Sequence, residues 1–278
     1  MLDSILDGLL DTLKLLPYLF ITFLILELIE HKLSKKTQES ISKHKKLGPI
    51  LGGIIGGFPQ CGFSAMASNL YTSKVITMGT LIAIFLSTSD EMLPVMLSEN
   101  ISISLVAKII GFKIIVGIII GLIVDLIFKS KIDSDNTIKD MCNEEHCHCK
   151  NGVLLSSVIH TLKTGLFILI ANLLINTIIY FVGEETLSNL LNTKNIFVYF
   201  IASLIGLIPN CAASIILTEV YISGIVPIGV TISGLLTGSG IGILLLFKNN
   251  KNLKENFTII SIIYFVGVLL GLLVDLVI

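Results

Sequence analysis

The stretch FPQCGFSAM at residues 58–66 stands in the middle of a long apolar region, where its proline and polar atoms are unexpected. A proline interrupts a helix, because its ring removes a backbone donor and clashes with the preceding turn. The stretch IPNCAASII at residues 208–216 repeats the pattern P-(Q/N)-C-x-x-S, again inside apolar sequence. A helix break that occurs twice in one chain predicts a fold built from two related halves.

The composition around these stretches is that of an integral membrane protein. The 278 residues are 53% hydrophobic and 14% charged, with a mean hydropathy of +0.92. A membrane-spanning helix needs about 20 mostly apolar residues. Stretches of this kind are found at 9–30, 75–98, 103–128, 153–182, 223–247 and 257–278. We therefore expect an all-α integral membrane protein whose first apolar stretch is a retained helix, because the opening residues lack the basic segment and cleavage site of a signal peptide.

The charged residues argue against several classes of function. The net charge of −1 provides no basic surface for a nucleic acid. All nineteen basic residues are lysine, whereas proteins that bind phosphate esters normally use the bidentate guanidinium of arginine. Neither the metalloprotease motif H-E-x-x-H nor a P-loop occurs. We therefore expect a protein that is not an enzyme, and a membrane-embedded enzyme is the disfavoured alternative.

A tandem duplication relates the two halves. A shift of 150 positions places residues 59–128 on residues 209–278 without a gap, so that Cys61 falls on Cys211 and Asp125 on Asp275. The sequence thus predicts a first membrane repeat, a polar linker and a second membrane repeat. These three parts cover residues 1–128, 129–152 and 153–278.

Lysine placement predicts the orientation of the repeats. The segment at 31–46 is strongly basic and should be cytoplasmic, whereas its counterpart at 183–195 is mildly acidic and should lie outside. Each repeat would then contain an odd number of membrane segments, about five, and the two repeats would have inverted topology. We therefore expect the N-terminus to lie outside and the linker to lie in the cytoplasm. The expected location is the inner or plasma membrane of the cell.

The cysteine motifs predict broken or re-entrant half-helices near the middle of the bilayer. Glycines precede Pro59 and Pro209, and irregular backbone survives at that depth only inside protein or beside a wet cavity. An inverted repeat would bring both breaks to one substrate site, where thiolates suit soft ions and amide or hydroxyl oxygens suit harder ones. The alternative is that these cysteines are merely small residues of a membrane core. The expected site residues are Pro59, Gln60, Cys61, Ser64, Pro209, Asn210, Cys211 and Ser214.

A second polar cluster, STSDEMLP at 87–94, lies inside another apolar stretch. Its counterpart LTGSGIG at 236–242 carries no acid. Ionisable groups at membrane depth suggest an ion or proton path, so Asp90 and Glu91 are candidates for proton coupling or for binding a divalent cation. The alternative places Glu91 at the outer interface and leaves only Asp90 deep.

Other charged residues of the apolar stretches have structural interpretations. Lys108 and Lys113 are expected to extend their ammonium groups to the lipid headgroups. Asp125 and Asp275, each in the last turn of its half, are expected to lie at interfaces or to cap neighbouring helices.

The linker carries the tract CNEEHCHC at 142–149. Dense cysteine and histidine in a cytosolic segment indicates metal binding, because the reducing cytosol disfavours disulfides. The alternative is a tolerated linker of biased composition. No tightly bound cofactor is expected, since the metal would be cargo. The candidate metal ligands are Cys142, His146, Cys147, His148 and Cys149.

Four of these features together resemble the ten-helix heavy-metal exporters, a bacterial family described as arsenic-efflux permeases or manganese transporters. They are the paired motifs at 59–64 and 209–214, S-T-S-D-E-M at 87–92, T-G-S-G at 237–240, and the Cys/His-rich linker. The resemblance implies an inner-membrane permease that moves a toxic metal or metalloid outward. We expect secondary, proton-coupled transport, and the alternative is a transporter or channel for manganese or another divalent cation that uses oxygen ligands.

Overall fold

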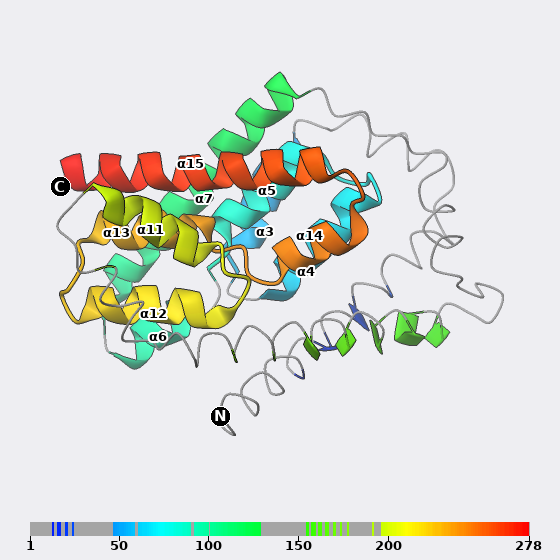
Figure 1. Cartoon of the computed structure of the whole chain (residues 1–278), viewed down its shortest axis with the longest axis horizontal. Coiled ribbons are helices and arrows are strands. Elements are labelled where there is room, and N and C mark those ends of the chain that lie inside the picture. Colours follow the sequence, from blue (N-terminus) through cyan, green and yellow to red (C-terminus); the bar gives the residue numbers. More distant parts are fainter. Residues whose placement is uncertain are drawn as a thin grey trace.

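The computed structural model describes residues 47–58, 61–89, 92–99, 101–128 and 196–277. It also describes scattered helical residues between positions 13 and 24 and between positions 154 and 191. Within these residues all regular structure is helical, which confirms the all-α class. The described helices of the first half are α3 (Gly48–Gly56), α4 (Cys61–Thr72), α5 (Met78–Ser87), α6 (Met92–Ser98) and α7 (Ile103–Ile127). Those of the second half are α11 (Phe197–Gly206), α12 (Cys211–Ile222), α13 (Ile228–Thr237), α14 (Gly242–Asn249) and α15 (Leu253–Val277) (Figure 1).

The helices of the two halves follow the same order at nearly the same spacing. Four successive helices of the second half, α12 to α15, each begin 150 positions after their counterparts α4 to α7. The duplicated sequence therefore folds into two similar sets of helices.

Among the described residues, three helical segments are long and apolar enough to cross a membrane: Ile103–Ile127 (α7), Ile228–Asn249 (α13 together with α14) and Leu253–Val277 (α15). The outer faces of α7 and α15 expose large apolar side chains at about every fourth position. Examples are Ile115, Ile119 and Ile123 on α7 and Phe265, Leu269 and Leu273 on α15. Exposure of such an apolar stripe to water is unfavourable, whereas its contact with lipid tails is not. The chain is thus a multi-pass membrane protein.

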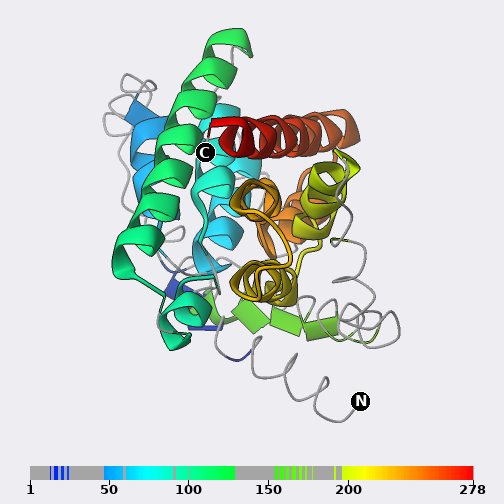
Figure 2. The same ribbon diagram turned by 90° about the vertical axis from the view of Figure 1, so that its left-hand side faces the viewer.

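The core centres on the two short helices α5 and α13. All ten residues of α5 are buried, and so are all but the first residue of α13. In the first half α5 packs between α3 and α7, and in the second α13 packs between α11 and α15. Figure 2 shows α13 (gold) directly beneath α15 (red), with α7 (green) upright to one side.

Glycines allow the central helices to touch their long neighbours. A Cβ atom on Gly79 of α5 would lie 2.1 Å from the carbonyl oxygen of Gly121 on α7. The same substitution at Gly229 of α13 would place a Cβ 2.3 Å from the carbonyl oxygen of Gly271 on α15. Both distances are too short for any side chain, so each crossing requires glycine.

Short helices of one half pack against short helices of the other. Helix α4 packs against α14 of the other half, and α12 packs against α6 (Figure 1). The Ser68 hydroxyl on α4 donates to the carbonyl oxygen of Gly242 on α14 at 2.6 Å. Residues far apart in sequence therefore form the interface between the halves.

Asp125 and Asp275 cap helices, as the sequence predicted. One oxygen of Asp125 accepts the Gly79 N–H at 2.8 Å, and the other accepts the Thr77 hydroxyl at 2.6 Å. In the second half Asp275 accepts the Gly229 N–H at 2.8 Å and the Tyr199 hydroxyl at 2.7 Å. Each carboxylate thus satisfies a backbone donor in the first turn of α5 or α13 that has no partner within the helix.

Candidate functional site

The helix breaks predicted at the cysteine motifs are present. Helix α3 ends at Gly56 and α4 begins at Cys61, while α11 ends at Gly206 and α12 begins at Cys211. A Cβ atom on Gly206 would lie 2.0 Å from the carbonyl oxygen of Gly234 on α13. The break in the second half is therefore held directly against the last turns of α13.

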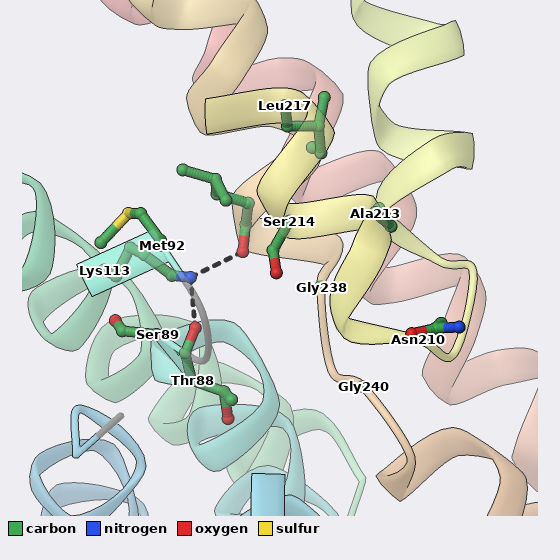
Figure 3. Close-up of a pocket in the computed structure, with 13 residues that line it drawn as sticks. Thr88, Ser89, Met92, Lys113, Asn210, Ala213, Ser214, Leu217, Gly238 and Gly240 are labelled. Carbon is green, nitrogen blue, oxygen red and sulfur yellow. Dashed lines mark hydrogen bonds between the residues drawn. The ribbon is translucent and has the colours of Figure 1, made fainter. Parts of the chain in front are cut away.

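A small cavity of about 10 Å³ lies where this break meets the ends of α5 and α13 (Figure 3). Its volume is at the lower limit of the space needed by one water molecule. The first half contributes Thr88, Ser89, Met92 and Lys113, and the second half contributes Gly206, Asn210, Ala213, Ser214, Leu217, Gly234, Leu235, Gly238 and Gly240. The cavity is thus built by both halves.

Two of the predicted site residues, Asn210 and Ser214, line this cavity from the start of α12. Pro209 is half-buried in the loop that precedes them. Ser64, the counterpart of Ser214, is fully buried but packs against α14, where a Cβ on Gly242 would lie 2.8 Å from its carbonyl oxygen. The structure places Ser64 in this interface and Ser214 at the cavity.

The remaining predicted site residues fall outside the described part of the chain. This holds for the side chains of Cys61 and Cys211, whose backbones begin α4 and α12. It also holds completely for Pro59, Gln60, Asp90, Glu91, Cys142, His146, Cys147, His148 and Cys149. Within the described ranges, no group of three or more His, Cys, Asp or Glu residues could hold a metal ion.

Lys113 does not extend to the lipid headgroups, and this prediction from the sequence is wrong. Its side chain is 1% exposed, near the middle of α7, and does not reach the headgroups. Its Nζ atom donates hydrogen bonds to the carbonyl oxygen of Thr88 and, at 2.7 Å, to that of Leu235 (Figure 3). Lys108, on the same helix, is exposed as predicted. The expectation failed for Lys113 because backbone oxygens inside the protein solvate its amine.

The repeat offers a signal that identifies Lys113. A shift of 150 positions places it on Ile263, which is buried in the hydrophobic core on α15. A lysine that occupies the equivalent of a core isoleucine is expected to point inward. The alignment becomes informative once the structure shows that Ile263 is buried, because isoleucines on α7 such as Ile115 and Ile119 are exposed.

The electrostatics of the cavity favour a positive charge. Thr88 caps the C-terminal end of α5, and Leu235 lies in the last turn of α13. The final carbonyls of a helix lack partners within the helix, and together they carry about half a negative elementary charge. Two such ends, one from each half, meet at the Lys113 amine. The hydroxyls of Ser89 and Ser214 and the Asn210 amide add polar groups to the lining.

Comparison with known families agrees with the sequence motifs. The family model described as "Putative, 10TM heavy-metal exporter" matches residues 2–181 and 148–244, two overlapping stretches that together span most of the chain. No curated protein and no solved structure matches the chain significantly. The long family match, the apolar helices and the paired helix breaks agree, and the chain belongs to the ten-transmembrane (10TM) heavy-metal exporter family.

Proposed function

We propose that the protein is an inner-membrane permease that exports a heavy metal or metalloid, either an arsenical or a soft or divalent metal ion, by secondary, proton-coupled transport. The family to which the chain belongs is described as heavy-metal exporters, which supports this class of function. The observation that carries the proposal is the cavity at the junction of the two halves, which is lined by residues of a predicted cysteine motif and by both helix ends. Such junctions are where transporters with discontinuous helices bind their substrates.

The two halves form inverted repeats that rock against each other around this junction. The packing of α4 against α14 and of α12 against α6 supports the arrangement, because the halves then meet through two equivalent pairs of helices. The short helices α3, α4, α11 and α12 are re-entrant half-helices in this scheme. Lysine placement supports an outside N-terminus and a cytoplasmic linker.

Cys61 and Cys211 supply soft ligands to the cargo. Each begins a twelve-residue helix at equivalent positions of the two halves, directly after a helix break. Pro59 and Pro209 set the breaks, and Gln60, Ser64, Asn210 and Ser214 add amide and hydroxyl groups. Thiolates bind trivalent arsenic and soft metals, so the paired cysteines favour this class of cargo.

Asp90 and Glu91 couple export to protons. The residues on either side of this pair, Ser89 and Met92, both line the cavity, which supports a coupling role beside the cargo path. The linker tract at 142–149 binds metal in the cytoplasm and delivers it to the membrane part. No catalytic residue is proposed.

One observation favours a second candidate, a transporter or channel for manganese or another divalent cation. The described lining of the cavity offers hydroxyl and amide oxygens, which are ligands of harder cations. In this scheme oxygen atoms bind the cargo and the cysteines are packing residues.

A panel of cargoes tests the proposal. A metal-sensitive host that expresses the protein would be grown with arsenite, cadmium, zinc, copper or manganese, and the cell-associated element would be measured. We expect resistance together with a lower cellular content of one of these elements. Everted vesicles would then take up that element only when a proton gradient is imposed. Unchanged growth and unchanged content of every element would contradict an export function.

A further inference from the structure

The Lys113 ammonium lies deep inside a membrane protein, where a charge is costly. Ionisable residues in membrane helices are rare and persist where partners compensate for the loss of water. The side chain is 1% exposed, and the equivalent position of the second half is the buried, uncharged Ile263. The groups around the ammonium must therefore offset the cost of burying its charge.

Among the described residues, two backbone carbonyl oxygens are partners of the amine. The Nζ atom donates to the carbonyl oxygen of Thr88, at the end of α5, and to that of Leu235, in the last turn of α13. The two carbonyls come from different halves of the chain. Because both helices end here, two partial negative charges converge on one amine.

Carbonyl oxygens at the C-terminal ends of interrupted helices are the groups with which transporters bind small cations. We propose that the ends of α5 and α13 form a site for a monovalent cation, and that the ammonium of Lys113 occupies it as a cation attached to the chain. One ammonium neutralises both helix ends, which explains why the second half needs no lysine at Ile263. The protein consequently holds its two halves together at this point without sodium or potassium.

Removal of the amine tests this assignment. K113A leaves room beside the two carbonyls, and its thermal stability would be compared in equal concentrations of ammonium, potassium, sodium and choline chloride. The readout is the fraction of a fluorescently tagged full-length protein in detergent that remains monodisperse after heating. We expect K113A to melt lowest in choline and to gain about 3 °C or more in at least one of the small cations. The wild type should melt at the same temperature in all four salts.

The matched control is K108A, which removes an exposed lysine from the same helix. It should show no difference among the four salts. If K113A also melts at one temperature in all four salts, no cation enters the site and the proposal is overturned.

Two further variants test the role of the Lys113 charge if K113A cannot be purified. K113M fills the space without charge, and K113Q keeps hydrogen-bond donors without charge. Both should melt lower than the wild type, because neither supplies a cation to the helix ends. Wild-type stability of either variant would overturn the proposal, since buried charges without a role can be replaced by apolar residues at no cost. The readout is stability, so failure here leaves the proposed export function untouched.

Discussion

The carboxylate of Asp125 accepts the backbone N–H of Gly79 at 2.8 Å and so joins the last turns of α7 to the first turn of α5. The same bond, also of 2.8 Å, joins Asp275 to Gly229 in the second half. A negative charge at a helix N-terminus satisfies an unpaired donor and interacts favourably with the helix dipole. Each half therefore uses one carboxylate to fix its central buried helix to its long outer helix.

Replacement of Asp125 by alanine should destabilise the protein. The variant loses hydrogen bonds from Gly79 and Thr77 to a charged acceptor, and a bond of this kind contributes about 1.5–3 kcal/mol. Thermal melting of D125A, and separately of D275A, would measure the loss. The exposed acid Glu99 provides the control E99A, which should melt like the wild type. Wild-type stability of both aspartate variants would show that these caps contribute nothing.

The crossing of α5 and α7 should not tolerate a methyl group at Gly121. A Cβ there would lie 2.5 Å from the carbonyl oxygen of Gly79, whereas a Cβ on Gly111 of the same helix meets nothing within 4 Å. We expect G121A to cost about 1–3 kcal/mol, as overpacked cores do. G111A should be neutral or slightly stabilising, because alanine favours a helix. Equal melting temperatures for the two variants would contradict the close crossing.

Lys74 has a left-handed backbone, and glycine should suit it better. Its φ angle is 52°, while Gly224 at the equivalent position has a φ of 71°. Both follow a helix in the same hydrogen-bonded turn, in which Val75 N–H donates to Leu70 and Ile225 N–H donates to Val220. K74G should therefore gain about 0.5–1 kcal/mol, because glycine relieves the left-handed strain.

K74A serves as the control for that gain, since it removes the lysine and keeps the strain. The reciprocal variant G224A should lose stability. A melting temperature of K74G at or below that of K74A would show that the backbone angle does not limit stability.

The two motif cysteines should be required for export if sulfur binds the cargo. C61S and C211S are expected to lose resistance and efflux while expression and melting temperature stay unchanged, because a hydroxyl replaces a thiolate as ligand. The comparison variant is C142S, which alters a cysteine of the linker and should weaken efflux without abolishing it, because the linker would only deliver metal. Full activity of both motif variants would exclude soft-ligand binding and favour the alternative with oxygen ligands.

Removal of residues 142–149 should weaken transport without abolishing it. The tract would deliver metal, whereas the membrane part would carry it. The measurement is efflux at low and at high cargo concentration, and the deficit should shrink as the concentration rises. A complete loss at every concentration would assign the tract to the transport path itself.

The sequence by itself determined the membrane class, the helix breaks and the duplication. Each of these depends on local properties: runs of apolar residues set the spans, and Pro209 with Gly206 ends a helix regardless of what surrounds it. For Asp125 and Asp275 the sequence predicted either an interface position or a helix cap, and the structure shows the caps.

Tertiary structure alone decided how the halves meet. Ser68 and Gly242 are 174 positions apart, and Lys113 and Leu235 are 122 positions apart. The sequence predicted that Lys113 lies at the membrane–water interface, because a long lysine side chain usually reaches the headgroups. The packing of α5, α7 and α13 brings two helix ends to its amine, and the carbonyl oxygens of these ends help to hold the lysine inside the protein.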